Sequence, residues 1–153
     1  MQIDLRVATA TDIDVMMPLV GMYHEFEGIA LGPDTRADAI MPLLDRGDLG
    51  RIWLIVVDED IVGYIAVCFG YSIEFAGRDA FVDEFFIRES YRGQGIGRMV
   101  LERIPVAVRE LEVCALHLEV AKTNSRVQRL YAAAGFKPRS RYQLMTLHLN
   151  ARS

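Results

Sequence analysis

Hydrophobic and polar positions follow two periods along the first half of the chain. Apolar residues alternate with polar ones over residues 3–7, which predicts an opening strand. Spacing of three and four residues then predicts two helices, one near Thr11, where Asp14 completes a capping-box pattern, and one over residues 34–46. Three more alternating segments predict strands, at residues 51–57, 61–69 and 80–88. Because short turns join these strands, we expect an antiparallel meander.

The second half of the chain predicts two helices and two strands. Residues 98–111 have helical periodicity, although Pro105 predicts a kink or a shortened first segment. A strand, a helix and a closing strand follow, at residues 115–120, 124–134 and 142–149. Gly135, directly after the second helix, is typical of a left-handed helix stop. The order β-α-α-β-β-β-α-β-α-β predicts a mixed α+β domain and not a doubly wound sheet.

Length and composition predict one globular domain over residues 1–153. An apolar fraction of 52% suffices for a core, and 153 residues are too few for two comfortable domains. The longest apolar run, residues 52–57, is far shorter than the ~18 residues that span a bilayer. Asp4 and Arg6 interrupt the segment where a signal peptide would be apolar. We therefore expect a soluble, cytoplasmic protein with no membrane partner.

The net charge, the cysteines and the histidines reduce the range of possible functions and partners. The net charge of −4 argues against a nucleic-acid partner, which normally requires a basic face, and is compatible with a cationic substrate. Cys68 and Cys114 lack the short spacing of a metal site, so we expect reduced core thiols and no bound metal. His24, His117 and His148 do not cluster in the sequence, and the alternation around His117 predicts a strand-surface residue.

One glycine-rich segment has the placement of a phosphate-binding loop. Residues 92–97 read Arg-Gly-Gln-Gly-Ile-Gly and lie between the strand that ends near Arg88 and the next helix. Glycines let the backbone approach a diphosphate and aim several N–H groups at it, and the helix adds its positive N-terminal end. Arg92 and Arg98 flank the three glycines with full positive charges. A single glycine would indicate only a connection, whereas this combination predicts a pyrophosphate site.

The residues leave more than one phosphate ligand open at this point. No Lys-Ser or Lys-Thr pair follows the last glycine, so the pattern is not a nucleoside-triphosphate loop. A dinucleotide fingerprint needs G-x-G-x-x-G in an opening βαβ unit, whereas these glycines run G-x-G-x-G in mid-chain. This departure weakens the dinucleotide alternative. Glu119 nevertheless lies about where that fingerprint places its ribose-binding acid, so the alternative is not excluded.

Two blocks of residues resemble the GNAT superfamily of N-acetyltransferases. The first, residues 82–97, reads Val-Asp-Glu-Phe-Phe-Ile-Arg-Glu-Ser-Tyr-Arg-Gly-Gln-Gly-Ile-Gly and is similar to the central motif of that family, Arg/Gln-x-x-Gly-x-Gly/Ala. The second, within residues 124–136, has Asn, then Leu-Tyr, then Gly-Phe at the spacing of the downstream motif. Pro105 and Val127 depart from the family pattern and bear on helix geometry more than on chemistry.

The resemblance implies a fold, a reaction and a set of binding residues. The fold is a mostly antiparallel, twisted central sheet with helices on both faces. The reaction moves an acetyl group from acetyl-CoA to a primary amine by direct attack in a ternary complex. A strand that separates from its neighbour would pair with the pantetheine arm, and a backbone donor there would act as an oxyanion hole. The residues so assigned to acetyl-CoA are Phe86, Ile87, Arg88, Arg92, Gly93, Gln94, Gly95, Ile96, Gly97, Arg98 and Asn124.

Three side chains are candidates for catalysis. An alkyl ammonium has a pKa of ~10, so attack needs a base that removes its proton. Glu84 is the first candidate and Asp83 its competitor, and strand alternation sends the two to opposite faces. Tyr131 is the candidate acid for the departing thiolate. A purely structural role is an alternative for each of them. The two acids are also explained as solvated or salt-bridged carboxylates at a strand end, and Tyr131 as a core aromatic. Asn124 is equally well explained as a helix N-cap.

The acceptor pocket in this family is built from the early helices and from the turn before the central strand. The candidates for contact with the acceptor are Tyr23, Glu25, Tyr71 and Glu74. Acids beside aromatic rings suit a cationic amine, although each acid alone is as readily a solvated surface group. We therefore expect a small cationic amine or a peptide or protein amine as acceptor. The competing functions are an acyl-CoA-binding module without activity and a dinucleotide-binding protein. Sheet-edge dimers are common in the family, which leaves a homodimer open.

Overall fold

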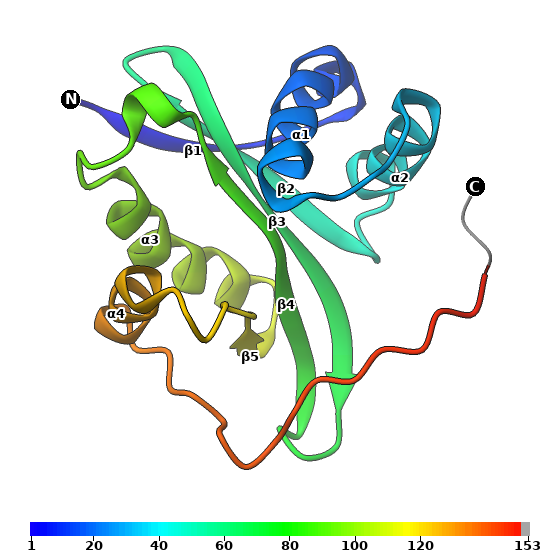
Figure 1. Cartoon of the computed structure of the whole chain (residues 1–153), viewed down its shortest axis with the longest axis vertical. Coiled ribbons are helices and arrows are strands. Elements are labelled where there is room, and N and C mark those ends of the chain that lie inside the picture. Colours follow the sequence, from blue (N-terminus) through cyan, green and yellow to red (C-terminus); the bar gives the residue numbers. More distant parts are fainter. Residues whose placement is uncertain (151–153) are drawn as a thin grey trace.

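The computed structural model describes residues 1–150 and has one five-stranded sheet with helices on both faces (Figure 1). The strands are β1 (Ile3–Val7), β2 (Gly50–Val57), β3 (Asp60–Ser72), β4 (Gly77–Ile87) and β5 (Val113–His117). The helices are α1 (Ile13–Glu27), α2 (Pro33–Asp45), α3 (Ile96–Glu110) and α4 (Ser125–Ala133), with short 3₁₀ turns at Ala10–Asp12 and Glu89–Tyr91. Strands β1 to β4 pair antiparallel in chain order, and β5 joins β4 in parallel. The predicted α+β fold, mostly antiparallel, is confirmed.

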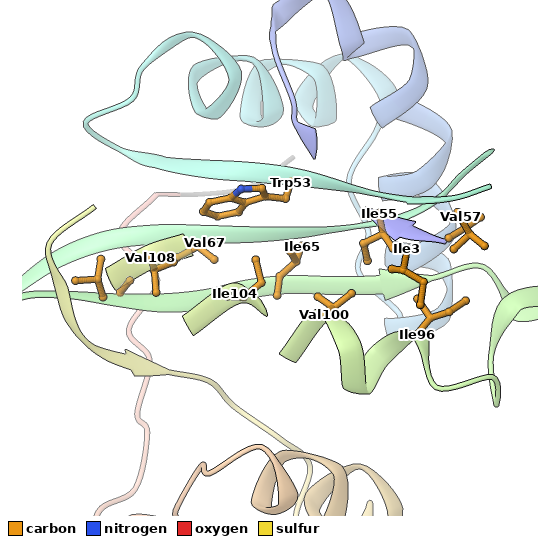
Figure 2. Close-up of a cluster of buried hydrophobic side chains, with 13 residues drawn as sticks. Ile3, Trp53, Ile55, Val57, Ile65, Val67, Ile96, Val100, Ile104 and Val108 are labelled. Atoms are coloured by element: carbon orange, nitrogen blue, oxygen red, sulfur yellow. The ribbon is translucent and has the colours of Figure 1, made fainter. Parts of the chain in front are cut away.

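One layer of the core lies between the sheet and α3. Figure 2 shows Ile96, Val100, Ile104 and Val108 of α3 facing the side chains of the sheet. These four residues recur every four positions and are buried, as an amphipathic helix requires. Because α3 continues through Pro105, the predicted shortening of its first segment is wrong. Ile96 sits in the first turn of α3, so this packing also holds the glycine segment against the end of β4.

A second layer lies between the opposite face of the sheet and helices α1 and α2. Met16, Leu19 and Val20 of α1 pack against Leu54 of β2 and Tyr64 of β3, all of them buried. This layer differs from the first because it leaves an open cavity between the two helices and the sheet. None of the helices within residues 1–150 is long and apolar enough to cross a bilayer.

A β-bulge in β4 changes which side chains share a face of the sheet. Ala66 of β3 pairs with Glu84, but the next residue, Val67, pairs with Val82, so Asp83 has no partner across the strand pair. An extra residue of this kind shifts the alternation by one position. Asp83 and Glu84 consequently line the same cavity, and the prediction that they lie on opposite faces is wrong.

The start of α1 and one cysteine also differ from the sequence-based expectation. The capping interaction is made by Asp12, whose carboxylate accepts a hydrogen bond from the Thr9 backbone N–H at 2.8 Å, and not by the pair Thr11 and Asp14. A 3₁₀ turn precedes the helix and moves the cap towards the N-terminus. Both cysteines are free thiols, but Cys114 is exposed on β5 and is not a core residue.

The closing strand predicted over residues 142–149 is absent, because no neighbouring strand lies beside this segment in the part of the chain that the structure describes. The chain after α4 has no regular element, and β5 ends at His117, three residues earlier than predicted. The exposed apolar side chains of this segment are Tyr142, Leu144, Met145, Leu147 and Leu149. Alternation created the expectation of a strand, but a strand also needs a partner for its backbone groups.

Candidate active site

Strands β4 and β5 separate halfway along the sheet. They pair only from Arg78 with Val113 to Phe81 with His117. Beyond that point the β5-facing edge of residues 82–87 has no neighbouring strand within residues 1–150. Unpaired backbone N–H and C=O groups at a sheet edge are available to an extended ligand that pairs as a strand would. The separation opens directly in front of the glycine segment.

The glycine segment forms a loop of free backbone donors at the start of α3. Gly93 and Gly95 adopt left-handed conformations with φ of 74° and 83°, which favour glycine over any other residue. Gly95 is the N-cap of α3, and no side chain caps this helix end. The first N–H groups of the helix are therefore unclaimed and face the loop, as an anion site at a helix N-terminus requires. This geometry fits the predicted pyrophosphate cradle.

The arginines of the segment are placed differently from one another. Arg92 donates from Nε to the carbonyl oxygen of Ile87 at 2.8 Å, and its guanidinium lies over the ring of Phe86, 5.4 Å from the centroid. Arg98 pairs with Glu102 one turn along α3, on the surface. The Nε atom of Arg88 is buried without a hydrogen-bond partner within the described chain. The end of β4 thus combines positive charge with an unsatisfied donor, which suits a polyanionic ligand.

A cavity of about 270 Å³ lies on the other face of the sheet, between α1, α2 and strands β2 to β4. Most of its wall is apolar. The polar exceptions on the sheet side are Tyr64, Asp83 and Glu84, with His24 of α1 beside them. Mostly apolar cavities with a few converging polar groups are typical of small-molecule sites.

Glu84 is fixed by two short hydrogen bonds. The Tyr64 hydroxyl donates to Oε1 at 2.7 Å, and His24 Nε2 lies 2.7 Å from Oε2. Since a carboxylate only accepts, we place the proton of His24 on Nε2, which leaves its buried Nδ1 without a partner. Burial and the negative charge of Glu84 raise the pKa of Tyr64 well above its usual range, so its hydroxyl remains a donor. His24 lies in the candidate site, although no cluster of residues around it in the sequence indicates this.

Asp83 stands next to this network but is outside it. Its carboxylate forms no hydrogen bond with the described residues and is exposed at the cavity. Partial burial, together with the negative charges of Glu84 and Glu119, raises the pKa of Asp83 above the usual value of 3.8. Asp83 is the more accessible of the two carboxylates, and its raised pKa suits a group that accepts a proton from a ligand.

Tyr131 lies half-buried on α4, with its ring packed edge-on against Phe136 at 5.9 Å. Burial and the negative charge of Glu27 raise the pKa of Tyr131, which keeps the phenol protonated near neutral pH. Asn124 is the N-cap of α4, where its side-chain oxygen accepts the Val127 N–H at 3.2 Å. The packing role and the capping role therefore both exist, and neither prevents contact with a ligand.

The structure separates the four candidates for acceptor contact. Tyr23 is half-buried beside the rings of Tyr64 and Phe86, close to the cavity. Glu25 is exposed on α1, Tyr71 is exposed at the end of β3, and Glu74 is paired with an arginine in the β3–β4 turn. None of these last three lines the cavity.

His117 has a local role in the sheet. Its Nε2 atom lies 3.2 Å from Asp79 Oδ2, and its ring packs against Phe75 and Phe81. Within residues 1–150 no group of three or more His, Cys, Asp or Glu side chains converges as metal ligands would.

Comparison with known proteins identifies relatives for most of this chain. Residues 19–136 match the model of the Acetyltransferase (GNAT) family. Over 75 residues the chain is 32% identical to thialysine N-epsilon-acetyltransferase of Bos taurus, covering 49% of this chain and 44% of that protein. Over 88 residues it is 30% identical to the uncharacterized N-acetyltransferase YycN of Bacillus subtilis (strain 168), covering 57% of this chain and 55% of that protein. These matches span about half the length of the curated relatives.

A solved structure matches almost the whole chain. It is the integron cassette protein HFX_CASS3 from the mobile metagenome of Cole Harbour Salt Marsh, with 34% identity and a TM-score of 0.85. The alignment covers 97% of this chain and 91% of that one. The similarity therefore includes the sheet, the glycine segment and the helices on both faces.

Proposed function

The chain belongs to the GNAT acetyltransferase family, and from this premise we propose that it transfers the acetyl group of acetyl-CoA to a primary amine. The observation that carries the proposal is the separation of β4 from β5 directly before the glycine loop. An extended pantetheine arm can pair with the free edge of β4 while the loop and the start of α3 bind the pyrophosphate. Both features are needed for one ligand, and they are adjacent.

The binding residues for acetyl-CoA follow from this placement. The β4 end contributes Phe86, Ile87 and Arg88, the loop contributes residues 92–97, and Arg98 and Asn124 flank it. Backbone donors at the β4 edge would stabilise the negative charge that develops on the acetyl carbonyl oxygen. Because this work belongs to the backbone, the side chains of Phe86 and Ile87 are free to pack, as Phe86 does.

Asp83 is the base of the proposed reaction. It reaches the cavity, is free of hydrogen bonds, and has a raised pKa, so it can take a proton from the ammonium group of the acceptor. Glu84 already accepts hydrogen bonds from Tyr64 and His24, which anchor its carboxylate. Glu84 then acts by holding a negative charge beside Asp83 and near the incoming cation.

Tyr131, the candidate acid of the sequence, is the proposed hydrogen-bond donor to the departing thiolate. A phenol with a pKa of ~10 exceeds the ~8.5 of a thiol, so full donation is uphill, and the raised pKa of Tyr131 makes it more so. A hydrogen bond from the phenol to the sulfur still stabilises charge as the carbon–sulfur bond breaks. This role depends on Tyr131 staying protonated, which its burial favours.

An amine acceptor has two lines of support. The acids Asp83 and Glu84 give the cavity a negative end, which favours a cationic substrate. In addition, the matching relative from Bos taurus is named for acetylation of thialysine on an ε-nitrogen. The support for a small acceptor over a folded protein is the cavity itself, because its volume suits a molecule of a few heavy atoms.

The test is an amine panel assayed for free thiol released from acetyl-CoA, with mass spectrometry of the acetylated product. Thiol release that depends on an amine supports the proposal. Tight acetyl-CoA binding without turnover on any amine favours the alternative of a binding module. A thermal-shift comparison covers the remaining alternative: stronger stabilisation by NAD than by acetyl-CoA would indicate a dinucleotide site.

A further inference from the structure

One basic side chain lines the cavity that we assign to the acceptor. Arg36 of α2 is half-buried, and it is the one Arg or Lys among the cavity-lining residues of the described chain. Its Nη2 atom donates to the carbonyl oxygen of Leu31 at 2.9 Å. A Cβ built on Gly21 of α1 would lie 3.3 Å from Nη1, tighter than an ordinary contact. The absence of a side chain at residue 21 thus makes room for this guanidinium.

The positive charge of Arg36 lacks a counter-charge from the protein. Within residues 1–150 no carboxylate lies at salt-bridge distance from it. Its Nε atom is also buried without a hydrogen-bond partner. A cation held in a mostly apolar wall is costly unless an anion joins it, because its hydration is partly lost. A negatively charged group on a bound molecule would supply that partner.

We propose that the acceptor is an amine that also has a carboxylate, with the size of a free amino acid, and that Arg36 binds the carboxylate. The inference rests on the proposed acetyl transfer. The amine would lie at the sheet, beside Asp83 and Glu84, and the carboxylate at α2, so each charge of the acceptor meets its opposite. Guanidinium groups bind carboxylates through two parallel hydrogen bonds. A cavity of about 270 Å³ has room for a molecule of this size.

The test compares amines that differ only by the carboxylate: lysine with cadaverine, and ornithine with putrescine. The readout is kcat/KM for thiol release at saturating acetyl-CoA. We expect the wild-type chain to prefer the amino acid of each pair by about tenfold or more, since a hydrogen-bonded charge pair is worth that much. Arg36→Met should reverse the preference, because it removes the carboxylate partner and also the repulsion of a dication. Arg36→Lys should keep part of the preference.

Matched outcomes separate this inference from the proposed function. Arg46→Met changes an exposed arginine at the other end of α2, which pairs with Asp48, and it should leave the wild-type preference intact. The inference is overturned if wild type uses both members of each pair equally, or if Arg36→Met lowers both in the same proportion, as a structural role would. Thermal unfolding of each variant detects a folding defect. If Arg36→Met has such a defect, the preference measured for Arg36→Lys decides between carboxylate binding and a structural role. Thiol release with no amine at all contradicts the transferase proposal instead.

Discussion

The Nε2 atom of His24 lies 2.7 Å from Oε2 of Glu84, and this contact joins α1 to β4 across 60 positions of sequence. Glu84 is held on its other oxygen by Tyr64, so both oxygens of this carboxylate are anchored. Asp83, which the bulge turns to the same side, is unconstrained. The two adjacent carboxylates therefore differ in their surroundings: Glu84 is anchored by two hydrogen bonds, whereas Asp83 forms none with the described residues.

Asp83→Asn should abolish most of the activity. The change removes the proposed base and keeps the shape of the side chain, so kcat should fall by at least ~100-fold while the KM for acetyl-CoA stays near its wild-type value. Glu84→Gln should instead lose less than about tenfold in kcat and lower the free energy of unfolding by about 1–3 kcal/mol, because its amide must face a donor. Steady-state thiol release and urea unfolding measure both. The reverse ranking of kcat would make Glu84 the base.

The pH dependence of kcat/KM should report Asp83. A base works when it is deprotonated, so activity rises with pH through the pKa of Asp83, which lies above 3.8 because of partial burial and the charge of Glu84. Removing that neighbouring charge with Glu84→Gln lowers the pKa of Asp83, and the acid limb should move to lower pH. The experiment is a pH profile of both chains with one amine. An acid limb that stays in place would show that Asp83 is not the group that titrates.

Gly95→Ala should weaken acetyl-CoA binding far more than Gly97→Ala. Gly95 has a φ of 83°, where an alanine is strained by about 1–2 kcal/mol, and any relief of that strain moves the N–H groups of the loop. A Cβ on Gly97 would lie 3.7 Å from its nearest neighbours, which is an ordinary contact. We expect a rise in Kd of about tenfold or more for Gly95→Ala and a clearly smaller rise for Gly97→Ala, measured by calorimetry. Equal effects would argue against backbone recognition by the loop.

Tyr131→Phe should lower kcat with little change in the KM for acetyl-CoA. The variant keeps the ring that packs on Phe136 and removes only the hydroxyl, so its effect isolates the stabilisation of the thiolate. A loss of about tenfold or more in kcat is expected for a group that donates a hydrogen bond to the charged sulfur. Tyr71→Phe is the control, since that phenol is 79% exposed and remote from the cavity. If the two variants behave alike, Tyr131 is a packing residue.

The parts of this fold that depend on local pattern were predictable, and the parts that depend on pairing were not. Alternation and helical spacing identified β2, β3, β4 and α2, and glycines between a strand and a helix identified the loop. The bulge at Asp83 depends on how β3 pairs with β4, which no local pattern reveals. The same holds for His24, whose partner is distant in sequence and close only once α1 packs on the sheet.

The segment over residues 142–149 is a second example of a local pattern that does not reveal pairing. Its alternation predicted a strand that the structure does not have, because a strand also needs a neighbouring strand and a local pattern does not identify one. Pro105 shows that a strong local signal can also be overridden, because the buried face of α3 stabilises the helix through the proline.

The stability of the fold should respond to acid through Asp12. Arg6 donates two hydrogen bonds to its carboxylate, at 3.1 and 3.2 Å, and this pairing holds the pKa of Asp12 below the usual 3.8. A group with a depressed folded-state pKa stabilises above its unfolded value, and that contribution is lost as pH falls through the folded value. Asp12→Asn should therefore cost about 1 kcal/mol at pH 7 and progressively less as the pH falls below 3.8.

Urea unfolding at pH 7 and at successively lower pH measures whether the unfolding free energies of Asp12→Asn and of the wild-type chain converge. Asp48→Asn is the matched control, because the pair Arg46–Asp48 is exposed on both sides and contributes little in water. Its unfolding free energy should stay close to that of the wild-type chain at every pH. If Asp12→Asn remains equally destabilised in acid, the loss comes from the cap geometry at Thr9 and not from the charge of the carboxylate, because only the charge contribution disappears when the carboxyl group is protonated.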